Sequence, residues 1–549
     1  MTVRSWGRRR GGRTRRRPRL QSRPFPEPCP LAPYSDRVNL FSYTELSIEG
    51  VSPPEPTDPR VFRNDWSTLT PPTVGSWTPG PTVSIVIPAR NNQRQLDRLL
   101  ACLTHQTYPA HLMEVVVVDD HSTPRLRLPD RRPHRCRIEP APPDGWGPGH
   151  ARAHGSRISS GEVLCWLDPD LLVEATLIET LVRWQHTHSH AVSFADLRYA
   201  LDHDPDPVDA ADPVVARTLR RRFPDAPPHP RIARLLARTN DLRDADSLSY
   251  QAFVGACVTM SRALYESAGG VNPALTLGHD TELGYRLWQH GAIFIPDREA
   301  RAWHVGSATA TRTRVPGLRS DALSTLVPYA RPAYRPRRRG EHRVPMVLAV
   351  VDAAQHPYEL VRACVDRLLA STGVEVDVVL VADWDTEADW WVEARLIQAH
   401  YLAEPRVRFA SHPPRTGFPA PYLLRVPVTC GVAPRTVAQL VDRAEWANAG
   451  VVELVHDTPQ QLTLWRTRAL ARTAAEPDDL STAVAAIHGR YRMQGRADTV
   501  DLSAIAVPHD WGIGARRPRP LTLLRHGWNR LAAVWHRSRD AVRRRPREH

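Results

Sequence analysis

Two aspartates separated by one residue, Asp168 and Asp170, directly follow an apolar run that predicts a buried strand. Carboxylate oxygens at this spacing can bind a hard divalent cation such as Mn²⁺ or Mg²⁺, and that cation can also bridge phosphate oxygens. A cation held in this way would stabilise the negative charge that develops on a departing phosphate. The Asp-Pro-Asp sequence alone is a weak signal, because turns after strands favour Asp and Pro for backbone reasons.

The strand before Asp168 is the third of a series. Apolar runs at 83–88, 114–118 and 162–167 predict buried strands, and leucines at helical spacing predict a helix over 95–106. A strand, a helix and a strand within about 40 residues form a right-handed parallel unit. Ligands of such sheets bind at the carboxyl ends of the strands, which here are residues 88–91 and 119–122.

The same pattern recurs in the second half of the chain. Residues 346–351, 357–369 and 376–382 again predict a strand, a helix and a strand. In this register Pro427-Val428-Thr429 takes the place of Asp168-Pro169-Asp170, so the second copy lacks the carboxylates. The sequence therefore predicts an α/β fold that is duplicated, although two unrelated α/β units in succession would give a similar pattern.

Composition excludes several classes of protein. The chain of 549 residues is 42% hydrophobic and has no apolar run long enough to span a bilayer, which indicates a soluble protein with a cytoplasmic location. All 73 basic residues are arginine, and 20 of them gather in two tails, nine at 4–19 and eleven at 516–547. The seven cysteines lie far apart, which predicts reduced, buried thiols and not a disulfide or zinc framework.

Five stretches of the first half follow one another in a specific order. They are VSIVIPARNN (83–92), THQTYP (104–109), EVVVVDDHS (114–122), GPGHARAHGSRISSGEVLCWLDPD (147–170) and GHDTELGYRLWQHGAIFIPDREARAWHVG (278–306). In this order they resemble the GT-A fold of family 2 glycosyltransferases, a Rossmann-like, mixed and mostly parallel sheet with flanking helices. The resemblance covers about 225 residues, and the order is far more specific than any single motif.

The resemblance implies a nucleotide site and a metal site. Pro88, Asn91 and Asp120 would line a uridine pocket, with Asp120 accepting the ring N–H of the base. Asp168 and Asp170 would bind the cation and the donor phosphates. The expected cofactor is therefore Mn²⁺ or Mg²⁺, and the expected donor is a nucleotide-diphosphate sugar.

Two further residues have implied roles and plainer alternatives. Asp280 would be the general base that deprotonates the acceptor hydroxyl, so that a single displacement inverts the anomeric centre. An acid at this place can equally be a helix cap or a partner of the helix dipole. His304 would complete the coordination of the cation, or it is a hydrogen-bonded core histidine.

Arg152 and Trp146 are less specific candidates. Arg152 can bind a donor phosphate or form a surface ion pair. Trp146 lies between two glycines and can stack on an acceptor sugar, although a lone aromatic residue in a loop more often only packs.

Four positions depart from the family pattern. Arg90 replaces a common aromatic residue, His121 replaces the usual Gly, and Ala153 replaces the usual Asn. These three changes leave the identity of the nucleotide open. His279 replaces the usual Glu before the base, a change that keeps Asp280 itself.

These interpretations divide the chain into five parts. The sequence predicts an Arg/Pro-rich tail and extension (1–80), a catalytic GT-A domain (81–315), a linker (316–344), a degenerate GT-A-like domain (345–510) and a basic amphipathic tail (511–549). The expected acceptor is a hydroxyl of a glycan or a lipid-linked molecule in cell-envelope or exopolysaccharide synthesis.

The C-terminal tail offers two interpretations. Leucines and tryptophans of 516–549 share one helical stripe among arginines, which suits either an anionic membrane surface or docking on the second domain. A membrane contact would make the enzyme peripheral on the inner face of the membrane. The rival functions are an inactive module that binds sugar nucleotides or glycans, and a nucleic-acid-binding protein that uses its Arg tails. No recognised nucleic-acid motif is present, so no nucleic-acid partner is expected.

Overall fold

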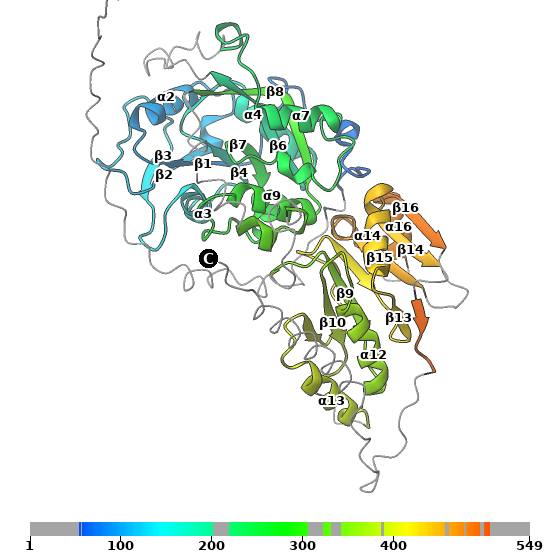
Figure 1. Ribbon diagram of the computed structural model, residues 1–549. Coiled ribbons are helices and arrows are strands. Elements are labelled where there is room, and N and C mark those ends of the chain that lie inside the picture. Colours follow the sequence, from blue (N-terminus) through cyan, green and yellow to red (C-terminus); the bar gives the residue numbers. More distant parts are fainter. Residues whose placement is uncertain are drawn as a thin grey trace, which may run out of the picture.

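Two α/β units follow one another along the chain in the computed structural model, each built round one large sheet (Figure 1). The structure describes residues 54–55, 57–200, 219–305, 322–330, 342–385, 389–455, 461–476, 479–494 and 499–504. The first unit contains the sheet strands between residues 83 and 305, and the second unit contains those between 347 and 494. The predicted Arg-rich N-terminal tail and the predicted amphipathic tail 511–549 lie outside the described residues.

The first sheet has eight strands in the order β3-β2-β1-β4-β7-β6-β8-β5. They are β1 (Val83–Ala89), β2 (Met113–Asp119), β3 (Cys136–Pro140), β4 (Val163–Leu167), β5 (Leu171–Val173), β6 (Ala191–Ala200), β7 (Cys257–Ser261) and β8 (Ile293–Val305). β1 pairs in parallel with β2 and β4, and β6 pairs in parallel with β8, whereas β7 is antiparallel to both of its neighbours. The predicted mixed, mostly parallel α/β sheet is confirmed.

Helices cover both faces of this sheet. They are α2 (Gln93–Leu103), α3 (Pro148–Ile158), α4 (Leu177–Thr187), α7 (Pro230–Arg238), α8 (Arg262–Ser267) and α9 (His279–Gln289). Side chains of β1 alternate between the two faces: Ile85 and Ile87 pack with α2 and α4, and Val86 packs in the cluster that contains Leu264 of α8 and Leu283 of α9. Because both faces are buried, the central strands are continuous apolar runs.

The second unit repeats this architecture. Its seven-stranded sheet has the order β11-β10-β9-β12-β15-β14-β16, which is the first order without the terminal β5. The strands are β9 (Val347–Asp352), β10 (Val376–Val381), β11 (Val407–Ala410), β12 (Tyr422–Arg425), β14 (Val451–Val455), β15 (Leu462–Arg466) and β16 (Arg490–Gln494). A separate pair joins β13 (Cys430–Val432) to β17 (Thr499–Asp501). The helices are α12 (Tyr358–Leu369), α13 (Trp391–Tyr401), α14 (Thr436–Trp446), α15 (Thr467–Leu470) and α16 (Leu480–His488).

Strand register shows which residues of the two units correspond. Val83 pairs with Val163 in the first sheet, and Val347 pairs with Tyr422 in the second. Counting on from these pairs places 427–429 at the position of 168–170, as the sequence predicts. The short strands β5 and β13 begin directly after these segments. The second unit therefore repeats the strand order of the first and has no carboxylate at the positions of Asp168 and Asp170.

Buried arginines join the two units. The Arg472 guanidinium donates to the carbonyl of Arg63, at 2.5 Å, and to that of Val61. Arg468 also donates to the Arg63 carbonyl, and its guanidinium lies 3.4 Å from the ring centroid of Trp288 in α9. Residues 61–63 of the N-terminal extension are thus held between the second unit and the first.

A carboxylate network extends this interface. Glu445 of α14 accepts hydrogen bonds from Ser247 and Tyr329 on one side and from Tyr422 and Arg466 of its own unit on the other. A partly buried carboxylate that accepts from donors of both units is best satisfied in one arrangement, so this network favours one relative placement of the units.

Part of the predicted linker 316–344 is described, and it is folded. Residues 322–330 bury Leu323, Leu326 and Val327 in the same apolar cluster as α9. This short stretch packs on the first unit.

Buried histidines near the interface make stability depend on pH. Burial, with nearby arginines, lowers the pKa of His188 to about 4, of His190 to about 3 and of His290 to about 4. The unfolded chain therefore binds more protons than the folded chain below the ordinary histidine pKa of about 6.5. We expect the free energy of unfolding to fall as pH is lowered from 6.5 to 5, by at most about 4 kcal/mol per pH unit for three histidines.

Urea titrations across this pH range measure the effect. His190→Gln should reduce the proton uptake on unfolding by about one proton. A free energy of unfolding that stays constant between pH 6.5 and 5 would contradict the burial of these neutral imidazoles.

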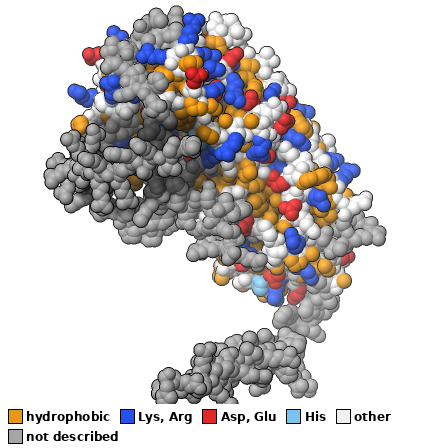
Figure 2. All heavy atoms as spheres, turned by 45° about the horizontal axis from the view of Figure 1, so that its top comes forward, with side chains coloured by type: hydrophobic (Ala, Val, Ile, Leu, Met, Phe, Trp, Pro, Cys, Tyr) orange, Lys and Arg blue, Asp and Glu red, His pale blue; other side chains and the backbone are white. Residues whose placement is uncertain are grey.

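The cysteines, the surface charges and the helices each bear on the expectations from composition. All six described cysteines are free, and five of them are buried. On the face drawn in Figure 2, arginine and acidic side chains are intermingled over the described residues. None of the described helices has the length and apolar character needed to cross a bilayer.

Candidate active site

An acidic cluster lies where β4 ends and β5 begins. Candidate ligand atoms of Asp168, Asp170 and His304 all lie within 4.8 Å of one another. β5 starts directly after Asp170 and pairs antiparallel with β8, which sets Leu171 opposite His304. Nε2 of His304 is 3.2 Å from Oδ1 of Asp170. The pairing of these two strands brings together groups that are more than a hundred residues apart in the sequence.

The electrostatics of this cluster suit a divalent cation. Burial, opposed by the His304 imidazole and reinforced by the nearby carboxylate of Asp168, raises the pKa of Asp170 to about 6. A divalent cation would relieve this crowding of carboxylates, and two carboxylates with one imidazole are a donor set that Mn²⁺ accepts. Nδ1 of His304 is buried and has no hydrogen-bond partner among the described residues.

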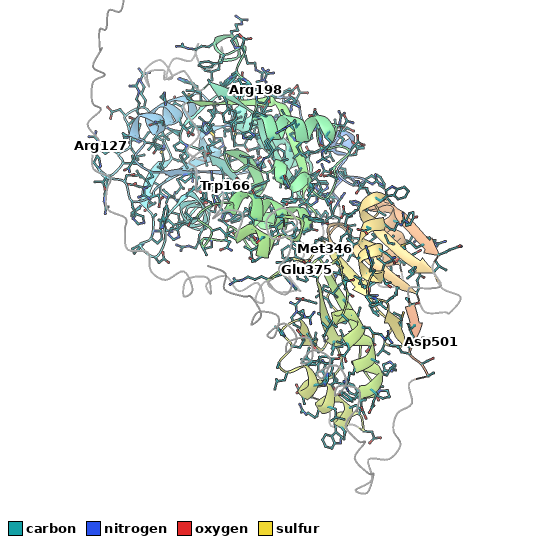
Figure 3. The ribbon with its side chains drawn as sticks, viewed as in Figure 1. Arg127, Trp166, Arg198, Met346, Glu375 and Asp501 are labelled. Carbon is teal, nitrogen blue, oxygen red and sulfur yellow. The ribbon has the colours of Figure 1, made fainter. Side chains whose placement is uncertain are left out.

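Arg152 of α3 lies behind the acidic cluster. Its Nη2 donates to Oδ1 of Asp168 and, at 2.8 Å, to the carbonyl oxygen of Gly255, and its Nη1 lies 2.8 Å from Nε2 of His279. The guanidinium also lies 5.5 Å from the ring centroid of Trp166 in β4, whose place inside the first unit is labelled in Figure 3. Arg152 is 4% exposed, and the Asp168 side chain is 27% exposed, so the ion pair joins a buried guanidinium to a partly exposed carboxylate.

Asp280 occupies the first turn of α9. The N-cap of this helix is Gly278, in the left-handed conformation at φ 81°, and His279 is the first helical residue. Asp280 is therefore not the N-cap, while its place in the first turn still fits the alternative of a partner of the helix dipole. Its Oδ1 accepts from the backbone N–H of Thr281 at 2.7 Å. Because His279 and Asp168 contact the same guanidinium, the start of α9 lies beside the acidic cluster.

The residues predicted to bind the nucleotide lie at the end of β1 and in the loops after β1 and β2. Pro88 is buried in β1. Asn91 has φ 54°; its N–H donates to Oγ of Ser122 at 2.9 Å, and its Oδ1 accepts from the N–H of Thr123 at 2.8 Å. Both carboxylate oxygens of Asp120 accept from the N–H of Gly147, at 3.1 and 3.0 Å. Asn91 and Asp120 thus sit at adjacent strand ends, as the topology predicts.

Two of the departures from the family pattern lie at the edge of this site. The Arg90 guanidinium is 3.9 Å from Asp120 and 5.7 Å from the ring centroid of Trp146. Trp146 is 51% exposed, which leaves its ring accessible and disfavours a purely packing role. His121 adopts φ 57°, a conformation that explains why glycine is usual there, and its Nε2 lies 3.1 Å from the Gly145 carbonyl oxygen.

Sequence reasoning missed two residues that shape the site. Asp119 accepts from the N–H groups of Ser122 and Leu126, at 3.0 and 3.1 Å, and thereby fixes the loop after β2. Tyr199 of β6 pairs with His304 across the strands, and their rings stack at 5.4 Å with an interplanar angle of 17°. Asp119 stands next to Asp120 in the stretch 114–122, so its position was visible in the sequence although its role was not. Tyr199 belongs to no motif, so no local pattern indicated it.

Comparison with known proteins identifies the first unit. Residues 84–233 match the family model described as Glycosyl transferase family 2. The first unit is a family 2 glycosyltransferase domain. Chondroitin synthase of Escherichia coli is 25% identical over 354 residues, which are 60% of this chain and 50% of that protein. Validoxylamine A glucosyltransferase of Streptomyces hygroscopicus subsp. limoneus is 30% identical over 242 residues, 42% of this chain and 52% of that protein.

The chain spans about half the length of these two curated relatives. Among solved structures, this chain is similar to S. aureus TarS 1–349 in complex with UDP-GlcNAc, with a TM-score of 0.34 and 14% identity. That alignment covers 46% of this chain and 67% of TarS 1–349. The assignment of the first unit rests on the family match and on its sheet.

Proposed function

We propose that this chain is an inverting, metal-dependent glycosyltransferase. It transfers a sugar from a nucleotide-diphosphate sugar, with UDP as the preferred nucleotide, to a hydroxyl of a glycan or a lipid-linked acceptor. The observation that carries this proposal is the contact of Arg152 with both Asp168 and His279, because it joins the acidic cluster to the helix that carries Asp280. A metal site can stabilise the leaving diphosphate while a base beside it takes the proton of the acceptor, and together they would support a single displacement.

Asp168, Asp170 and His304 are the residues that would hold Mn²⁺ or Mg²⁺. When bound, the cation supplies Lewis-acid stabilisation of the diphosphate that leaves. Asp170 and His304 keep their ligand atoms together through the β5–β8 pairing, so the protein does not have to reorganise on binding.

Asp280 acts on the acceptor. Its carboxylate takes the proton of the acceptor hydroxyl while that oxygen attacks the anomeric carbon on the side opposite the diphosphate. The hydrogen bond from the Thr281 N–H fixes one oxygen of the carboxylate. One displacement without a covalent intermediate gives a product of inverted configuration.

The loops after β1 and β2 bind the nucleotide in this proposal. Pro88 and Asn91 line the base pocket, and the carboxylate of Asp120 accepts the ring N–H of uracil. Asp120 is already held by the Gly147 N–H, so it enters the complex preorganised. The Arg90 and Trp146 side chains lie beside Asp120 and are available to contact the base or the acceptor.

An inactive binding module is the main alternative function. The second unit fits that description, because 427–429 carry no carboxylate at the position of the acidic cluster. The first unit retains the acidic cluster, which favours an active transferase. The second unit would then bind the acceptor or stabilise the first unit.

A screen of UDP-, GDP- and TDP-sugars tests the proposal. The full chain should hydrolyse or transfer from UDP-sugars only when Mn²⁺ or Mg²⁺ is present, and UDP with Mn²⁺ should raise its melting temperature. No turnover and no stabilisation with any of the three nucleotides would contradict the transferase. Stabilisation without turnover would instead favour the binding module.

A further inference from the structure

His279 stands where the family pattern has Glu, and its contact with Arg152 is buried. Arginine has only donors, so Nε2 of His279 must be the acceptor of the 2.8 Å contact with Nη1. The imidazole is therefore neutral there, with its proton on Nδ1. His279 is 5% exposed, and a Cβ atom added at Gly149 of α3 would lie 2.9 Å from its Cγ, so the ring is packed against α3.

Arg152 distributes its donors over three parts of the first unit. Asp168 follows β4, Gly255 lies just before β7, and His279 begins α9. The planar guanidinium has fixed donor directions, so three acceptors held at once define the relative positions of these three parts. One of these parts carries the acidic cluster and another carries Asp280.

From this arrangement we infer that His279 is a positioning residue that acts through Arg152. By accepting from Nη1, His279 keeps the guanidinium shared between α9 and Asp168. This sharing fixes the start of α9 against the acidic cluster and limits the hold of Arg152 on the Asp168 carboxylate. The inference rests on the proposed function, because it assigns His279 a role in the metal site and in the alignment of Asp280.

Loss of this acceptor has two physical consequences. Nη1 would lose its partner on α9 and would pair with the nearest carboxylate, Asp168, which then competes more strongly against a cation. The first turn of α9 would also lose a contact that orients it, so Asp280 would be less well aligned. His279→Leu removes the acceptor, whereas His279→Gln retains an oxygen that can accept from Arg152.

Mn²⁺ titrations followed by electron paramagnetic resonance test the first consequence in the full-length protein. We expect the Mn²⁺ dissociation constant to rise about tenfold in His279→Leu and to stay within about twofold of wild type in His279→Gln. His290→Leu is the matched control, since His290 is a buried histidine at the other end of α9 and should leave Mn²⁺ binding unchanged. His279→Met, of similar volume, replaces His279→Leu if the latter does not fold.

Turnover with a UDP-sugar tests the second consequence. At saturating Mn²⁺ the kcat of His279→Leu should fall about tenfold with little change in the donor KM, and His279→Gln should restore most of it. Equal Mn²⁺ affinity and equal kcat in wild type and His279→Leu would overturn this inference alone. Absence of Mn²⁺ binding by the wild-type protein would overturn the proposed metal site and the inference with it.

Discussion

Asp280→Asn should lower kcat for sugar transfer by about 10²- to 10⁴-fold, the range expected when a general base is removed. The amide retains an oxygen that can accept from the Thr281 N–H, so the first turn of α9 should keep its structure. Donor binding does not require the base, and the stabilisation of the protein by UDP and Mn²⁺ should therefore be unchanged. Initial rates with saturating donor and acceptor measure the loss.

A matched control for Asp280→Asn is available on the neighbouring helix. Glu266 of α8 is an exposed helical acid in the same unit, and Glu266→Gln should retain full activity. If Asp280→Asn and Glu266→Gln had equal turnover, Asp280 would not be the base.

Asp170→Asn should remove the response of the protein to divalent cations. Replacing one of two carboxylates weakens a site that otherwise has only Asp168 and His304, and Lewis-acid stabilisation worth several kcal/mol is lost with the cation. We expect activity to fall by about 10²-fold or more, with no Mn²⁺-dependent rise in the melting temperature in the presence of UDP. Activity assays and thermal scans over a Mn²⁺ series measure both effects.

The control for Asp170→Asn should be an acid far from the cluster. Asp366 of α12 belongs to the second unit, and Asp366→Asn should leave the Mn²⁺ response unchanged. An Asp170→Asn protein that still binds Mn²⁺ with wild-type affinity would place the metal elsewhere.

The central strands were predictable because they are buried on both faces. β1, β2 and β4 agree with the predicted strands to within one residue at each end, and the strand–helix–strand opening of the second unit is found as β9, α12 and β10. Two other strands escaped sequence reasoning. β6 has a register shift between Ala195 and Asp196 that breaks its alternation, and β8 carries charged residues from Asp297 onward that interrupt its apolar pattern.

β6 and β8 also determine which contacts of the site could be predicted from the sequence. The adjacency of Asp170 and His304 depends on the pairing of β5 with β8, and the stacking of Tyr199 depends on the pairing of β6 with β8. Long-range pairing of this kind leaves no local pattern, so the position of His304 followed only from the family resemblance. Arg152 was a candidate from the sequence, whereas the contact of its guanidinium with both Asp168 and His279 is visible only in the structure.

Anomalous diffraction from crystals of the full chain with Mn²⁺ and an intact UDP-sugar analogue would test directly whether the acidic cluster and Asp280 face the same bound donor. We predict a manganese peak bound by Asp170 and His304, with the Asp280 carboxylate facing the anomeric carbon from the side opposite the diphosphate. A peak at another place in the chain, or an Asp280 carboxylate remote from the sugar, would contradict a single-displacement transferase.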